Sequence, residues 1–156
     1  MNIAILLPLA LLGGCGVLPY DPPSGPHSAT LTFTSDDLAA QPMICVTGAG
    51  FQATGTSLAH KPWPGPAFDE AMKTLKKADR VTTTVASGPD TRVGVMLNLR
   101  QAQQSRERCK AAVRFNAQPG AHYRIDFTRD HHRCGLEVHG EDGVHVDAVP
   151  IAWRCP

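Results

Sequence analysis

The chain has almost no net charge and no long apolar run. Its 15 lysines and arginines nearly balance 14 aspartates and glutamates, so the formal charge is +1. Because nucleic-acid binding depends on positive charge gathered against phosphates, we expect no nucleic-acid partner. The main apolar run, Ile3–Leu12, is about half the length that a membrane-spanning helix needs. A transmembrane helix is therefore not expected.

The sequence also lacks the familiar motifs of nucleophilic and redox catalysis. The serines in expected loops, Ser57, Ser87 and Ser105, lie outside the Gly-x-Ser-x-Gly pattern of a serine nucleophile. No Cys-x-x-Cys pair indicates a zinc or thiol-redox site. These absences favour a protein that is not an enzyme.

One glycine-rich segment needs a separate interpretation. Residues 48–53 have the Gly-x-Gly-x-x-Ala spacing of dinucleotide-binding loops. The prolines at 62, 64 and 66 would stop the long helix that such a loop requires. We therefore interpret the segment as a flexible loop at one end of the domain.

The amino terminus carries the most specific pattern in the chain. Leu12-Gly13-Gly14-Cys15 follows a short apolar run, with an apolar residue at −3 and small residues at −2 and −1. This pattern resembles a bacterial lipobox. The resemblance implies a signal peptide over residues 1–14, removed by signal peptidase II. It also implies a lipidated Cys15, with a thioether-linked diacylglycerol and an N-acyl chain such as palmitate. Gly16 at +2 is not aspartate, which implies sorting to the outer membrane.

Residues 15–28 are rich in proline, glycine and serine. This composition predicts an extended tether that holds a folded domain away from the lipid headgroups. One domain is then expected over residues 29–156, which is enough chain for a single hydrophobic core.

Four cysteines remain in that domain: Cys45, Cys109, Cys134 and Cys155. An even count in an exported domain indicates two disulfides, with three possible pairings. We favour Cys45–Cys109 and Cys134–Cys155, although a simple hairpin register places Cys155 beyond Cys134. Cys109, Cys134 and Cys155 each fall on the apolar face of an expected strand, and we expect them to face the core.

Alternating apolar and polar residues predict about eight strands. A helix with apolar residues at helical spacing is expected over residues 67–80. The expected fold is all-β: an antiparallel β-sandwich of immunoglobulin-like architecture, with one short helix and two disulfides.

A predicted hairpin gathers histidines and carboxylates on one polar face. Gly140-Glu141-Asp142-Gly143 suits a three-residue loop in which Gly143 is left-handed. That register sets His139 opposite His145 and Glu137 opposite Asp147. Such a group can bind zinc or copper, and a solvated sheet face is the other interpretation. His131 and His132 add further potential ligands nearby.

The domain is similar to small, disulfide-bonded β-sandwich lipoproteins of Gram-negative envelopes, most without an assigned activity. The lipobox and the strand and cysteine pattern from Cys45 to Cys155 carry this resemblance. It implies a membrane-anchored protein and names no activity. Our first hypothesis is a non-enzymatic binding module whose partner is an envelope protein or a surface ligand. The alternative is a periplasmic metal-binding protein. Residues 48–66 and 100–108 are the expected contact loops, and Trp63 is the expected exposed aromatic residue.

Overall fold

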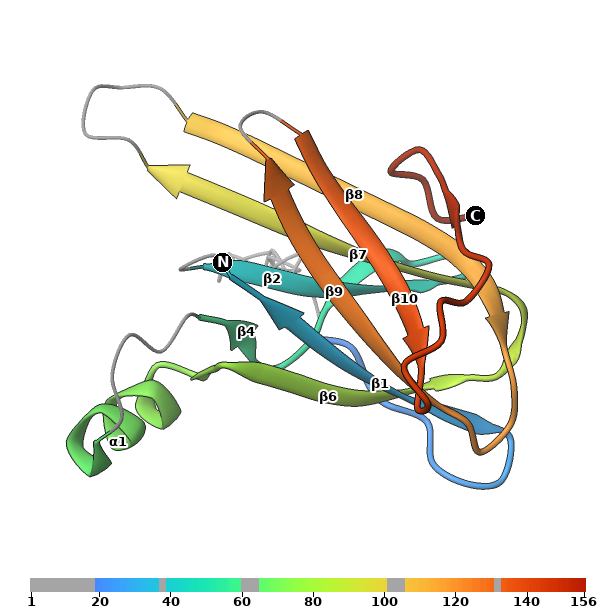
Figure 1. Ribbon diagram of the computed structural model, residues 1–156, viewed down its shortest axis with the longest axis horizontal. Coiled ribbons are helices and arrows are strands. Elements are labelled where there is room, and N and C mark those ends of the chain that lie inside the picture. The colour runs from blue at the N-terminus through green and yellow to red at the C-terminus, as the bar shows by residue number, and fades with distance from the viewer. Residues whose placement is uncertain (1–18, 37–38, 60–64, 101–105, 131–132) are drawn as a thin grey trace, which may run out of the picture.

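Two β-sheets pack face to face around a single apolar core (Figure 1). The computed structural model describes residues 19–36, 39–59, 65–100, 106–130 and 133–156. These residues form the expected all-β sandwich with one short helix and two disulfides.

Sheet A is the smaller of the two sheets. Within the described residues it has four strands in the order β10, β9, β1, β6. Their bounds are Arg133–Gly140 for β10, His122–Asp130 for β9, Ser28–Ser35 for β1 and Arg80–Ala86 for β6. β1 pairs with β6 and β10 with β9 in antiparallel fashion, whereas β1 and β9 are parallel. The sandwich is therefore mixed rather than wholly antiparallel.

Sheet B has seven strands in the described part of the chain, with the path β11, β8, β7, β2, β4, β5 and with β3 paired to β2. Their bounds are Val149–Pro150 for β11, Arg106–Ala117 for β8, Gly88–Arg100 for β7, Ala40–Val46 for β2, Gly50–Ala53 for β3, Ser57–Leu58 for β4 and Lys77–Ala78 for β5. Its two longest strands, β7 and β8, form an antiparallel pair. β4 and β5 are parallel to each other.

The core lies between the sheets because apolar residues occupy every second position of their long strands. In β1 and β9, Leu31, Phe33 and Ile125 are fully buried, and Val93 and Val95 of β7 face them from sheet B. Burying side chains of this size stabilises the fold by about 1.5–3 kcal/mol each. This two-residue period is the feature that the sequence showed most directly.

The glycine-rich segment is part of sheet B rather than a flexible loop. Gly48 and Gly50 have φ values of 78° and 83°, which glycine adopts without steric cost. They turn the chain from β2 directly into β3. The expected contact loop over residues 48–66 thus contains two strands, and β8 begins at Arg106 within the other expected loop.

The helix is shorter than the expected span of residues 67–80. α1 runs from Pro66 to Thr74 and buries Met72. Lys76 follows with a φ of 51°, a left-handed conformation that ends a helix. The chain then enters β5, so pairing with β4 replaces the last expected helical turn.

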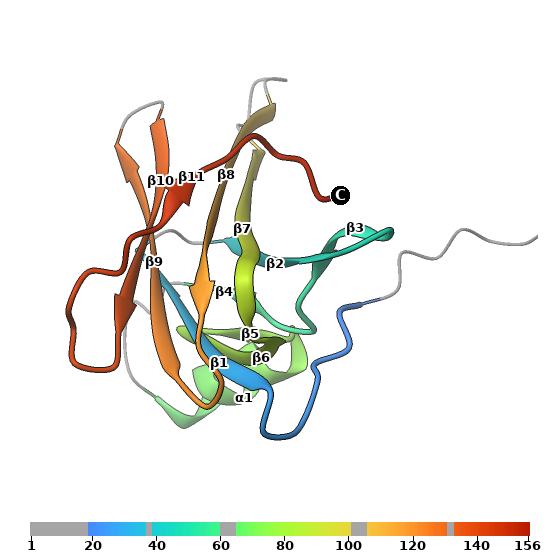
Figure 2. The same cartoon turned by 90° about the vertical axis from the view of Figure 1, so that its right-hand side faces the viewer.

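Residues 20–27, here called the N-terminal strap, lie against the domain instead of forming a free tether (Figure 2). The backbone N–H of Tyr20 donates to the carbonyl of Ala53 at 2.8 Å, and its hydroxyl donates to the carbonyl of Thr84 at 3.0 Å. Thr84 Oγ1 donates in turn to the carbonyl of Pro23. The expected tether from residue 15 to residue 28 is therefore fixed to the domain from Tyr20 onward.

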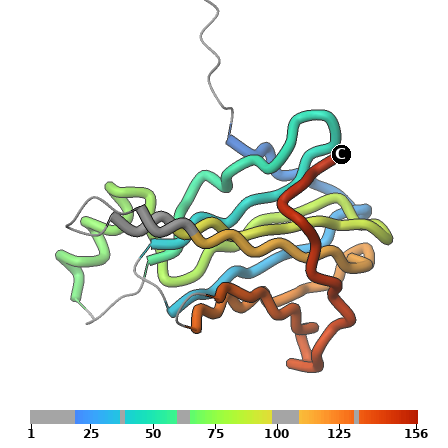
Figure 3. Tube along the Cα trace, turned by 90° about the horizontal axis from the view of Figure 1, so that it is seen from above, coloured from blue at the N-terminus to red at the C-terminus, as the bar shows by residue number. Residues whose placement is uncertain are grey.

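The disulfides pair Cys45 with Cys155 and Cys109 with Cys134, so the expected pairing is wrong. Cys109 in β8 and Cys134 in β10 face each other across the core, with Cα atoms 6.0 Å apart. After β11 the C-terminal tail, residues 151–156, crosses the outer face of sheet B (Figure 3). This path brings Cys155 to Cys45, with Cα atoms 5.4 Å apart. The expectation failed because it treated residues 149–155 as a core strand.

Candidate metal centre

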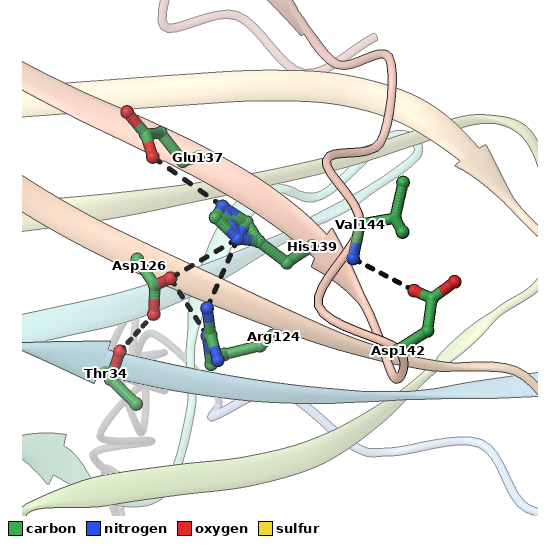
Figure 4. A network of polar contacts seen from close by, with 7 residues as sticks. All are labelled: Thr34, Arg124, Asp126, Glu137, His139, Asp142 and Val144. Carbon is green, nitrogen blue, oxygen red and sulfur yellow. Dashed lines mark hydrogen bonds and ion pairs between the residues drawn. The ribbon is translucent and has the colours of Figure 1, made fainter.

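The hairpin after β10 forms as its glycines predict (Figure 4). Gly143 has a φ of 78°, and the N–H of Gly140 donates to the carbonyl of Val144 at 2.8 Å. Asp142 Oδ1 accepts a hydrogen bond from the N–H of Val144 at 3.0 Å, which stabilises the turn from within. The three-residue loop is confirmed.

This turn places His139 and His145 opposite each other in an antiparallel bridge, as expected. Their ring centroids are 5.2 Å apart. Glu137, two residues before His139 on the same face of β10, has its Oε2 atom 3.6 Å from Nε2 of His139. One ligand atom from each of these three residues lies within 4.8 Å of the others. Three of the four predicted ligands therefore come together.

Asp147 does not belong to this group among the residues that the structure describes. The ladder of the hairpin ends after the N–H of Val146 donates to the carbonyl of Val138. The chain then leaves for β11 in the other sheet. Beyond the bridge between His139 and His145, no further pairing of β10 with the chain after the turn is formed among the described residues. The expected fourth ligand was wrong because the hairpin is only a few residues long.

Arg124 and Asp126 of β9 form a second layer of side chains, which lies next to the Nδ1 atom of His139 (Figure 4). Arg124 Nη2 lies 3.3 Å from Nδ1 of His139, and Asp126 Oδ2 lies 3.7 Å from the same atom. Arg124 Nε donates to Asp126 Oδ2 at 2.9 Å. Thr34 Oγ1 of β1 donates to Asp126 Oδ1. The carboxylate of Asp126 is thus fixed from two sides.

Sequence reasoning missed this second layer, although a signal existed. Arg124 and Asp126 alternate with the apolar residues of β9, and this alternation places both on the polar face. Their contact with His139 depends on the β9–β10 register, which the sequence did not specify.

The Nε2 atom of His139 is the most unusual feature of the group. The His139 side chain is 15% exposed, and Nε2 is buried with no hydrogen-bond partner among the described residues. A buried polar atom without a partner costs about 1–3 kcal/mol, so such atoms are rare in folded proteins. Glu137 Oε2, at 3.6 Å, is beyond ordinary hydrogen-bond distance.

The ligand set suits a borderline transition metal. Imidazole nitrogens with one carboxylate oxygen are donors that Zn²⁺ and Cu²⁺ accept. Metal-binding histidines usually have their second ring nitrogen next to a carboxylate or a carbonyl. Asp126 has that position at His139. Glu137 and His145 are exposed, so an ion could reach the site from solvent.

A second concave feature lies beside the N-terminal strap, between β2, β6 and β7. Its volume is about 480 Å³, and Tyr20, Val46 and Val85 are among its lining residues. Asp90 and Arg92 at its rim form an ion pair of 2.8 Å, and the hydrogen bond from Arg92 lowers the pKa of Asp90. Asp90 and Arg92 already bind each other, so they are less available to a ligand than the side chains of the histidine group.

Four residues that the sequence singled out lie outside the described part of the chain: Cys15, Trp63, His131 and His132. In the part that is described, no helix is long and apolar enough to cross a membrane. Neither a protein-family model nor a curated protein matches this chain.

Proposed function

We propose that this chain is a lipid-anchored protein of the bacterial cell envelope, placed in the outer membrane, whose domain binds a ligand without catalysing a reaction. The lipobox around Cys15 supports the anchor. The ligand that the geometry supports best is a zinc or copper ion held by Glu137, His139 and His145.

The observation that carries this proposal is the Nε2 atom of His139, which has no hydrogen-bond partner within the described part of the chain. On a merely solvated sheet face, this nitrogen would exchange hydrogen bonds with water. Here it is buried beside Glu137, while Nδ1 on the other side of the ring is next to Asp126 and Arg124. A metal ion at Nε2 would supply the missing partner and would also neutralise Glu137.

Metal-dependent melting of the full chain tests this proposal. An ion that binds only the folded state at 100 times its Kd adds about 2.7 kcal/mol of stability. We expect zinc or copper to raise the melting temperature of the wild type. The double variant His139→Ala/His145→Ala should lose this shift.

His122→Ala is the matched control, because His122 is exposed on β9 of the same sheet but is not part of the group. It should keep the full shift. A wild-type melting temperature that neither metal changes would remove the metal proposal.

A second candidate function is contact with an envelope protein or a surface ligand. The cavity beside the strap favours it, as do the exposed apolar side chains of Val144 and Val149. Trp63 is a further proposed contact. Crosslinking in intact cells followed by purification should recover one stoichiometric partner if this function is correct. Recovery of no partner would leave metal binding as the remaining proposal.

A further inference from the structure

Arg124 lies against one ring nitrogen of His139 and so favours one of its two tautomers. Arg124 Nη2 lies 3.3 Å from Nδ1 of His139. The guanidinium has donors and no acceptor, so Nδ1 must be the acceptor. In a neutral imidazole the proton is then on Nε2. In this tautomer Nε2 has no free lone pair, and it cannot bind an ion.

Asp126 favours the opposite tautomer. Its Oδ2 atom lies 3.7 Å from the same Nδ1 atom, and an ionised carboxylate can only accept hydrogen bonds. Arg124 Nε and Thr34 Oγ1 hold the carboxylate in this position. A small closure would let Asp126 accept a proton from Nδ1, which leaves the lone pair of Nε2 free. Arg124 and Asp126 therefore have opposing effects on one ring.

We propose that Arg124 and Asp126 are positioning residues that set the metal affinity of the site through the tautomer of His139. This inference rests on the metal site proposed above. When the ion takes Nε2, the N–H bond at Nε2 breaks and one forms at Nδ1, with water as the carrier of the proton. Arg124 Nη2 releases Nδ1, Arg124 Nε stays on Asp126, and Asp126 accepts the new N–H.

The structure thus assigns a restraining role to Arg124 and a supporting role to Asp126. Residues behind a metal-bound histidine typically change metal affinity by about 10–100-fold. We expect Asp126→Asn to weaken zinc binding by this amount, because the amide can donate to Nδ1 and stabilise the wrong tautomer. We expect Arg124→Met to bind zinc several-fold more tightly.

Zinc titration calorimetry on the full chain compares these variants with the wild type. Removal of Arg124 also lowers the net charge of the chain by one. Arg133→Met makes the same change in net charge away from the site, since Arg133 is exposed on the same face of β10. Arg133 lies four residues from Glu137, a separation of about 13 Å along a strand, which is more than the Debye length of about 8 Å. Its zinc affinity should equal that of the wild type.

The ring ¹⁵N spectrum of the metal-free protein supplies a reading that a purely structural role would not change. We expect His139 to be protonated at Nε2 in the wild type and to shift toward Nδ1 in Arg124→Met. If the wild type binds no zinc, the proposed function and this inference both fail. If His139 and His145 bind zinc while the two variants match the wild type in affinity and tautomer, this inference alone fails.

Discussion

At the scale of single residues, Gly94 shows how closely the C-terminal tail packs on sheet B. The indole of Trp153 stacks on Phe51, with centroids 4.4 Å apart, and Lys110 lies over it at 5.2 Å. A Cβ atom at Gly94 would come within 2.7 Å of Trp153 Cζ3 and 3.1 Å of the carbonyl of Ala111. The absence of a side chain at this position makes room for the indole.

Gly94→Ala should therefore destabilise the domain by about 1–3 kcal/mol, the usual cost of overpacking. Urea unfolding followed by tryptophan fluorescence measures this loss. Gly55→Ala is the control, because a Cβ atom there meets none of the described atoms within 4 Å. Equal stability of the two variants would contradict close packing of the tail.

Tyr20 gives the strap a pH dependence. Burial raises the pKa of Tyr20 to about 12, and the neighbouring charge of Asp21 adds to this effect. The folded state thus holds the phenol proton more tightly than the unfolded chain, whose pKa is about 10. The stability from this group is complete below pH 10 and is lost as the pH rises toward 12.

Tyr20→Phe removes both the hydrogen bond to Thr84 and this loss of stability at high pH. The stability difference between wild type and Tyr20→Phe should therefore shrink between pH 8 and pH 11, as measured by urea unfolding. A stability difference that stays the same from pH 8 to pH 11 would contradict this role of Tyr20.

Site residues were predictable where one hairpin determines their positions. Gly143 fixes the loop, and the loop fixes His139 opposite His145. Asp147 was wrongly included, since nothing in the sequence shows where pairing ends. Arg124 and Asp126 were missed because their approach to His139 depends on a neighbouring strand and not on spacing within the hairpin.

At the scale of elements, long strands were predictable and short ones were not. β1 and β9 alternate clearly, because one face is buried and the other is in solvent. β4, β5 and β11 have two residues each, too few to show a period. The end of α1 was also missed, because the pairing of β5 with β4 competes with the helix.

The two disulfides hold different elements, and their removal should have unequal effects. Cys45–Cys155 spans 110 residues and fixes the tail, whereas Cys109–Cys134 spans 25 residues and joins β8 to β10. Chain entropy predicts losses of about 5 and about 3.5 kcal/mol for Cys45→Ala/Cys155→Ala and Cys109→Ala/Cys134→Ala respectively. Urea unfolding of both double variants gives the order. A larger loss for Cys109→Ala/Cys134→Ala would show that strain or residual unfolded structure outweighs loop length.

At the scale of the whole molecule, the alternation of apolar and polar residues predicted a β-sandwich. It did not predict which strands pair with each other. The parallel pairing of β1 with β9 joins residues that are about 90 positions apart in sequence, and local pattern carries no information on such a contact. The disulfide pairing was mispredicted for the same reason, because it also depends on contacts between distant parts of the chain. Cys155 reaches Cys45 because the tail crosses sheet B, a path set by the packing of Trp153 and not by strand parity.

The position of the strap also determines how the proposed anchor would hold the domain. Five residue steps separate Cys15 from Tyr20, which span at most about 18 Å. Tyr20 contacts β6 at one edge of sheet A, whereas the histidine group lies on β10 at the other edge. A lipid at Cys15 would therefore keep the domain near the membrane and leave the metal site accessible.

Cys15→Ser should abolish lipidation and move the full chain from the membrane fraction to the soluble fraction, while its zinc affinity stays unchanged. Fractionation after a carbonate wash and zinc titration of both forms measure the two effects. Ser24→Ala in the strap is the control, and it should remain with the membranes. A Cys15→Ser chain that still sediments would refute the anchor. Weaker zinc binding in that variant would show that the anchor and the histidine group are coupled, contrary to their separation across sheet A.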